Sequence, residues 1–233
     1  MCADCARCSW VSPITGDPAG LSSRPGARQG GRRYPANPPT TEEIVAMLRA
    51  CPTTACGRRL KALVIVLWRS GLRTSEALAL EERDLDPVAG SIKVRRGKAG
   101  KRRIVETDPW AWRQIEPWLD ERLRLSPGPV FCVVHGPTAG RHTSASAART
   151  ALKSLAADAG VRRRIAPHQL RHCHAIELAR EGVPVHLLQR QLGHANPAVT
   201  TVYLSGVAPE EVLRAAQLRR PPSVLITHLI DAS

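Results

Sequence analysis

Apolar residues recur at helical spacing through much of the chain, and short polar or glycine-containing breaks separate the segments. Thr40 with Glu43 three residues later is the sequence signature of a helix capping box, so a helix should begin there. The apolar positions that follow at helical spacing are Ile44, Met47, Leu48 and Cys51. After a break up to Gly57, RRLKALVIVLWRSG predicts a second helix that is mostly buried and ends at Gly71.

The rest of the pattern predicts further helices and a few strands. Ser75 to Leu80 is a short predicted helix, residues 109–125 a longer one with three tryptophans, and residues 144–159 another. We interpret Trp110, Trp112 and Trp118 as core packing. Two short strands joined by a glycine-containing turn are predicted over 91–107, and a further strand over 128–134. The predicted fold is therefore mainly α with a small antiparallel β-sheet, an α+β class.

Composition adds a partner to this outline. The chain has 233 residues, 43% of them hydrophobic but only 3% aromatic, which is enough for one substantial core of aliphatic side chains. Lys and Arg total 34 against 20 Asp and Glu, a formal net charge of +14. Such an excess attracts polyanions, and nucleic acid is the first candidate. The competing interpretation is a protein that is simply rich in arginine.

The two ends of the chain differ from its middle. Residues 1–39 are rich in Pro, Gly, Ser and Arg, so we expect a disordered basic arm. Residues 209–220 predict a helix and residues 223–230 a short apolar tail, which packs either on its own domain or on a second copy. The expected organisation is an arm over 1–39, a folded domain over 40–206 and a C-terminal helix and tail over 207–233.

Cysteine usage and hydropathy bear on the compartment. The chain has seven cysteines, with no disulfide framework, no signal peptide and no apolar run near the ~18 residues of a membrane span. A cytoplasmic protein without membrane contact is expected. Cys2, Cys5 and Cys8 have a spacing that metal ligands use, but three thiols without a fourth favour an unstructured start, and no metal site is predicted.

Polar residues with chemical potential gather between residues 166 and 203. This stretch is predicted as helix broken by short turns, and its candidate residues are His168, Arg171, His172, His194 and Tyr203. Tyr203 is one of only two tyrosines in the chain. Arginine and histidine beside a hydroxyl nucleophile are the residue types that phosphate chemistry uses.

Upstream residues extend this cluster. Arg73 precedes the first turn of a predicted helix, where an arginine opposes the helix dipole unless it faces an anion such as phosphate; the alternative is a surface arginine paired with Glu76. Between Lys93 and Arg103 lie seven basic residues and no acid, so the hairpin has a charged tip. The candidates for contact with a phosphate backbone are Arg95, Arg96, Lys101, Arg102 and Arg103. Lys98 lies at the turn, where its flexible side chain can deliver a proton to a specific oxygen, and Lys101 is close enough to compete for that role.

Five short motifs occur in one order along the chain: GLRTSE at 71–76, GKAGK at 97–101, HQLRH at 168–172, LGH at 192–194 and TTVY at 200–203. Each is weak alone, but together they closely resemble the catalytic domain of the tyrosine recombinases, the family of phage integrases and Xer proteins. The resemblance implies the DNA breaking-and-rejoining fold of that family. It also implies a site-specific recombinase that acts through a 3′-phosphotyrosyl intermediate.

The resemblance assigns roles to residues. Tyr203 would be the nucleophile, and Arg73 and Arg171 would bind the phosphate oxygens. His168 and His194 would add hydrogen bonds, and Lys98 would protonate the leaving 5′-oxygen. Glu76 would orient Arg73 or a neighbouring basic group, and His172 would support the site without taking part in the reaction.

Partners and alternatives follow from the same resemblance. Two arginines supply the charge that a metal would otherwise provide, so no cofactor is expected. The expected partners are double-stranded DNA and further copies of the chain, which would form a dimer to a tetramer on the DNA. Most family members carry a helical DNA-clamping domain of about one hundred residues before the catalytic domain, and only about 39 disorder-like residues precede it here. Two other functions stay open: a nicking-closing enzyme like type IB topoisomerases, and a catalytically idle or truncated DNA-binding protein.

Overall fold

The computed structural model describes residues 38–95 and 102–193. Its first helix, α1 (Thr41–Ala50), begins with the predicted capping box: the Thr40 hydroxyl accepts from the Glu43 backbone N–H, and the Glu43 carboxylate accepts from the Thr40 backbone N–H. The predicted arm over 1–39, except for its last two residues, and the segment 207–233 lie outside the described residues.

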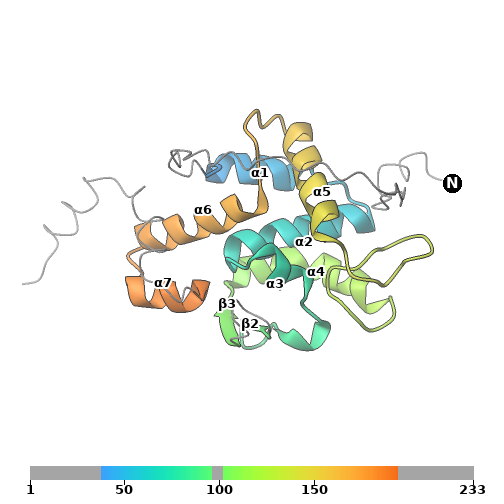
Figure 1. Cartoon of the computed structure of the whole chain (residues 1–233), viewed down its shortest axis with the longest axis horizontal. Coiled ribbons are helices and arrows are strands. Elements are labelled where there is room, and N and C mark those ends of the chain that lie inside the picture. The colour runs from blue at the N-terminus through green and yellow to red at the C-terminus, as the bar shows by residue number, and fades with distance from the viewer. Residues whose placement is uncertain (1–37, 96–101, 194–233) are drawn as a thin grey trace, which may run out of the picture.

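Helix α2 (Ala55–Arg69) runs through the middle of the domain, which confirms the predicted buried helix. Every residue from Ala62 to Trp68 is buried. The helices α4 (Pro109–Leu123), α5 (Ala145–Asp158) and α6 (Pro167–Arg180) cover them, because they pack against different sides of α2 (Figure 1). A helix that is apolar on all sides is stable in water only when neighbours cover it in this way. The chain leaves α2 through Gly71, whose positive φ of 62° starts the turn into α3 (Thr74–Leu78).

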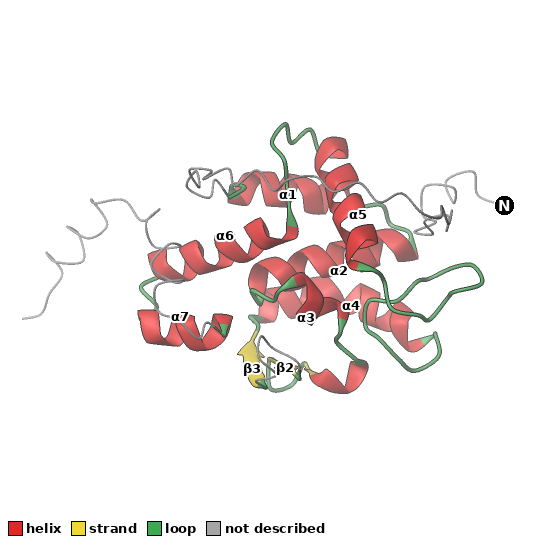
Figure 2. Cartoon of the chain, viewed as in Figure 1, coloured by secondary structure: helices red, strands yellow, loops and turns green. Residues whose placement is uncertain are grey.

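A three-stranded antiparallel sheet, in the order β1-β2-β3, lies at the lower edge of the domain in Figure 2. The predicted hairpin strands are confirmed as β2 (Ser91–Val94) and β3 (Arg103–Glu106). The pattern did not predict β1 (Leu85–Asp86), which pairs with β2 after a 3-10 turn over Glu82–Asp84. Two residues are too few for a visible alternation of apolar and polar side chains. The sheet buries only its inner face, through side chains such as Ile92 and Val105.

Helices α4 (Pro109–Leu123) and α5 (Ala145–Asp158) match their predictions. Trp112 and Trp118 are buried as expected, and Trp118 lies at the centre of the core with 1% of its surface exposed. Trp110 does not belong to the core. It is 37% exposed and its ring meets the edge of Trp68 at a centroid distance of 5.9 Å.

The strand predicted over 128–134 is absent from the described structure; only isolated bridges form there, Glu81 with Pro129 and Cys132 with His142. Side chains occupy the carbonyl groups that a sheet partner would need. The carbonyls of residues 129, 130 and 132 accept hydrogen bonds from Arg122, Trp118 and Arg59 respectively. Apolar side chains there are buried as a loop, so the hydrophobic run was real but its assignment as a strand was wrong.

Helices α6 (Pro167–Arg180) and α7 (Val185–Leu192) form a pair at one side of the domain (Figure 1). A small apolar cluster, separate from the main core, joins them through Ala175, Leu188 and Leu192. Polar contacts hold α7 to the sheet: the Gln191 side chain exchanges two hydrogen bonds with the backbone of Glu106. None of the described helices has both the length and the apolar character that crossing a bilayer requires.

Candidate active site

The Glu76 carboxylate lies at the point where α3, α6 and β3 meet, and only 3% of the residue is exposed. A buried carboxylate is costly unless cations and hydrogen-bond donors surround it. Burial raises the pKa of Glu76, but hydrogen bonds and charge from Arg103 and Arg73 outweigh that effect and bring the pKa to about 2. Glu76 is therefore a carboxylate at neutral pH and a counter-charge for several arginines.

Arg73 holds Glu76 from the entrance of α3. Its backbone N–H donates to Glu76 Oε2 at 2.9 Å, and its guanidinium donates to Oε1 at 2.7 Å. The interpretation of Arg73 as a surface arginine paired with Glu76 thus describes a real contact. The pairing leaves 28% of the Arg73 side chain exposed, and Nη2 also lies 3.4 Å from the Gly193 carbonyl. Arg73 is thus fixed in place and still accessible from solvent.

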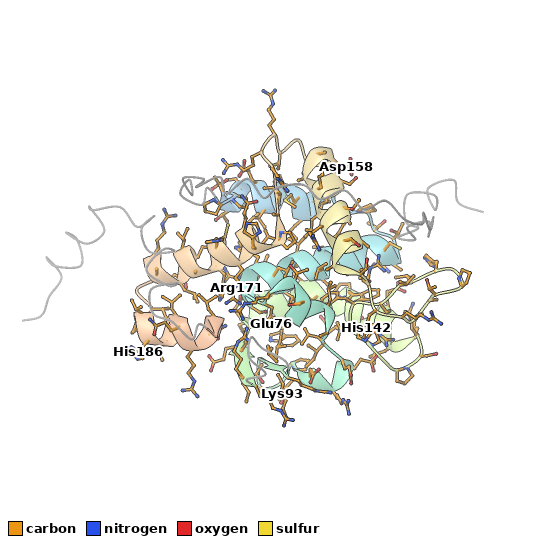
Figure 3. All side chains as sticks on the ribbon, in the orientation of Figure 1. Glu76, Lys93, His142, Asp158, Arg171 and His186 are labelled. Atoms are coloured by element: carbon orange, nitrogen blue, oxygen red, sulfur yellow. The ribbon has the colours of Figure 1, made fainter. Side chains whose placement is uncertain are left out.

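Arg171 reaches the same carboxylate from α6, far away in the sequence. Its Nη1 lies 3.8 Å from Glu76 Oε2, and Figure 3 shows the two side chains next to each other near the middle of the domain. Nη1 also donates to the Gly71 carbonyl at 2.6 Å, and Nη2 donates to the Leu192 carbonyl. The Arg171 side chain is 4% exposed. It joins three of the five motifs, because Gly71, Arg171 and Leu192 each belong to a different one.

Arg103 completes the group of cations around Glu76. Nη1 and Nη2 each donate to one oxygen of the carboxylate, at 2.9 and 2.8 Å, and Nε donates to the Gln191 carbonyl at 3.2 Å. The sequence analysis placed Arg103 among the DNA-backbone contacts. Only 11% of its side chain is exposed, and all three guanidinium nitrogens have protein partners. Its position points to a role inside the site.

The other basic residues of the hairpin are less enclosed. Arg95 forms ion pairs with Asp84 and Glu81, and 32% of its side chain is exposed. Arg102 is exposed, next to the strand that carries Arg103. Arg96, Lys98 and Lys101 lie outside the described residues. Their predicted roles stay predictions.

Two histidines lie near Arg171 on α6, His168 three residues before it and His172 directly after it. His168 is exposed, and its ring meets that of His172 at a centroid distance of 6.0 Å. Burial, together with electrostatic interactions with His168 and Arg171, lowers the pKa of His172 to about 4. His172 is therefore neutral at pH 7. The neutral, half-buried ring of His172 suits a supporting position. His186 lies on the outer surface of α7, away from Glu76 (Figure 3).

His174 and Gly71 form a contact that the motifs did not reveal. A β-carbon on Gly71 would lie 2.3 Å from Cδ2 of His174, so the buried imidazole packs directly under this turn. Burial, together with the charges of Arg69 and Arg171, lowers the pKa of His174 to about 4. The glycine of GLRTSE was the available signal, since glycine is the usual residue where the backbone adopts a positive φ or approaches another group closely.

The site as described lacks three members of the predicted set, because Lys98, His194 and Tyr203 lie outside the described residues. Gly193, the residue before His194, ends α7 with a positive φ of 63°. The structure thus brings together Arg73, Glu76 and Arg171, with His168 and His172 on the same helix as Arg171. Within the described residues, no group of three or more metal-ligating side chains occurs.

Comparison with known proteins gives this geometry a family. The sequence profile described as the phage integrase family matches residues 40–207. The tyrosine recombinase XerA of Thermococcus kodakarensis is 33% identical over 181 residues, which cover 76% of this chain and 60% of XerA. The type 1 fimbriae regulatory protein FimE of Escherichia coli K12 is 31% identical over 169 residues, which cover 72% of this chain and 85% of FimE.

Solved structures agree on the fold. A crystal structure of XerA recombinase superimposes with a TM-score of 0.67 and 26% identity, covering 82% of this chain and 67% of that one. The XerH site-specific recombinase, in a post-cleavage complex with its palindromic difH substrate, gives a TM-score of 0.65 at 23% identity and covers 82% of this chain and 55% of that one. The fold is that of a tyrosine recombinase catalytic domain. The chain belongs to the phage integrase family, and it spans about 60% of the length of the XerA relative.

Proposed function

We propose that this chain is the catalytic part of a site-specific DNA recombinase that cuts and rejoins strands through a 3′-phosphotyrosyl intermediate. The observation that carries the proposal is the convergence of Arg73 and Arg171, from separate helices, on the buried carboxylate of Glu76. Two cations that cannot lose their charge suit the oxygens of a phosphodiester. The names of XerA and XerH as recombinases support the same reaction.

In the proposed reaction, Tyr203 Oη attacks the phosphorus of one strand and the bond from phosphorus to the 5′-oxygen breaks. The tyrosine proton passes to His168 or to solvent, and Lys98 donates a proton to the leaving 5′-oxygen. The new phosphotyrosyl ester retains the energy of the broken diester. The 5′-hydroxyl of a second strand can therefore attack it and release Tyr203 without ATP.

Charge stabilisation in this scheme falls to Arg73 and Arg171, with hydrogen bonds from His168 and His194. Glu76 keeps the two guanidinium groups in place and offsets part of their mutual repulsion. The two arginines carry the positive charge that metal ions supply in other phosphoryl-transfer enzymes, so the scheme requires no metal.

The proposed partners are double-stranded DNA and further copies of this chain. Arg95, Arg96, Lys101 and Arg102 would contact the phosphate backbone, and the DNA-bound state of the XerH relative supports this. A palindromic site, such as the one bound by XerH, presents the same half-site twice and therefore suits two copies of one protein. Strand exchange between two such sites would bring four copies together. DNA as substrate would place the protein in the cytoplasm with the nucleoid.

Covalent trapping tests the proposal. The protein is incubated with a pool of nicked duplexes of varied sequence, in which the short fragment that carries the new 5′-hydroxyl diffuses away after cleavage. Covalent adducts are then separated on a denaturing gel. Wild type should form a protein–DNA adduct, and Tyr203→Phe should form none while still binding DNA. DNA binding by wild type without an adduct would contradict the proposal and identify a binding protein. Relaxation of supercoiled plasmid without exchange between two duplexes would identify a nicking-closing enzyme instead.

A further inference from the structure

Arg103 links three elements that each carry part of the proposed site. It belongs to β3, and its guanidinium donates two hydrogen bonds to the carboxylate of Glu76 on α3. Its Nε donates to the Gln191 carbonyl in the last turn of α7. A two-pronged contact between guanidinium and carboxylate fixes the orientation of both groups as well as their distance. Glu76 in turn contacts Arg73 and Arg171, so the orientation of its carboxylate affects both proposed phosphate-binding groups.

Arg103 also packs against the residue before His194. A β-carbon on Gly193 would lie 3.0 Å from both Cδ and Nε of Arg103, so the arginine side chain lies directly against this glycine. The apolar contacts of α7 are made with α6, while its contacts with the sheet include the polar ones from Arg103 and Gln191. The position of the Leu192–Gly193 turn relative to Glu76 thus depends on hydrogen bonds from three arginines, namely Arg103, Arg73 and Arg171.

We propose that Arg103 is a positioning residue of the site: it orients the Glu76 carboxylate toward Arg73 and Arg171 and holds the end of α7, at Gln191 and Gly193, beside them. The competing role is contact with the DNA backbone, which the basic run of the hairpin predicts. Two observations favour positioning, namely the 11% exposure of the side chain and the protein partner on every guanidinium nitrogen. The inference rests on the proposed function, because its measured effect is DNA cleavage.

The test separates cleavage from binding in Arg103→Met, which keeps the length of the side chain but removes its charge. Cleavage of the trapped substrate at saturating DNA should fall on the order of 10- to 100-fold, the usual cost of losing a residue that orients catalytic groups. The dissociation constant for DNA and its dependence on salt should stay close to wild type. Arg102→Met, at the exposed neighbouring position, is the matched comparison: there the affinity should fall and the salt slope should decrease by about 1.

Two further variants test the route of the effect. Arg103→Lys retains one charge but cannot make the paired contact, so its cleavage rate should lie between wild type and Arg103→Met. In the double variant Arg103→Met with Glu76→Gln, the loss should be much smaller than the product of the two single losses, because both changes remove the same contact.

The possible outcomes are distinct. A weaker affinity and a smaller salt slope for Arg103→Met, with normal cleavage at saturation, would overturn the inference and restore the DNA-contact role, while the proposed function would stand. Multiplicative losses in the double variant would also overturn it. An absence of adduct with wild type would overturn the proposed function and this inference together. Circular dichroism shows whether a variant has unfolded; if Arg103→Met has, Arg103→Lys decides by the same comparison of cleavage with salt slope.

Discussion

Replacing Glu76 by glutamine should destabilise the domain strongly, although the two side chains have nearly the same shape. The carboxylate is 3% exposed and contacts three guanidinium groups, those of Arg73, Arg103 and Arg171. Removing one member of a buried ion pair costs about 3–5 kcal/mol, because the remaining charges are left without a partner. Glutamine can still accept hydrogen bonds through its carbonyl, so we expect the lower end of this range, about 3 kcal/mol.

The pKa of Glu76 gives a second route to the same magnitude. The pKa falls from an ordinary value of 4.5 to about 2 in the folded protein. That difference corresponds to a stabilisation of about 3 kcal/mol above pH 4.5. Because the folded pKa is the lower one, this stabilisation is complete above pH 4.5 and is lost as the pH falls toward 2. The stability difference between wild type and Glu76→Gln should therefore shrink over that window.

Urea unfolding followed by circular dichroism measures both effects. With a urea dependence of about 2 kcal/mol per molar, the midpoint of Glu76→Gln at pH 7 should lie about 1.5 M below that of wild type. Glu116→Gln removes an exposed carboxylate on α4 and should change the stability by less than about 0.5 kcal/mol. Equal midpoints for wild type and Glu76→Gln would refute the reasoning. A difference that stays constant from pH 5 to pH 3 would refute the role of the charge.

Three other predictions concern the turn at Gly71, the buried His174 and the proposed proton donor Lys98. Gly71→Ala should lower the free energy of unfolding, measured in urea, by about 2–5 kcal/mol, because its φ is positive and a β-carbon there would lie 2.3 Å from His174. Gly182→Ala, which has a positive φ but open space around it, should cost only about 1–2 kcal/mol. Equal costs would contradict the packing argument. The pKa of His174 is lowered from 6.5 to about 4 in the folded protein. As the pH falls from 6.5 to 4, the free energy of unfolding of the wild type should therefore fall by up to about 3 kcal/mol more than that of His174→Gln. Parallel curves of stability against pH would show that the histidine is not held neutral. Lys98→Ala should lose cleavage on normal DNA but regain it on a 5′-bridging phosphorothiolate, whose leaving group needs no proton; equal loss on both substrates would move the role to Lys101.

Local sequence rules predicted most of the helices. The capping box at Thr40 and Glu43 and the apolar spacing of α2 both act over three or four residues. Such signals do not depend on distant parts of the chain. The strand over 128–134 failed for the opposite reason: distant side chains such as Arg59 take its carbonyl groups, and no local pattern reports that.

The motifs determined the family and the candidate residues of the site, because their order and spacing are properties of the chain alone. Only the tertiary structure showed which group each of the described residues contacts. Arg102 and Arg103 are adjacent members of one basic run, yet one is exposed and the other faces a buried carboxylate. Alternation along the strand sends neighbouring side chains to opposite sides, and which side holds Glu76 depends on how α3 and α7 pack against the sheet. Charge along a sequence identifies a basic segment, but the partner of each charge is a property of the fold.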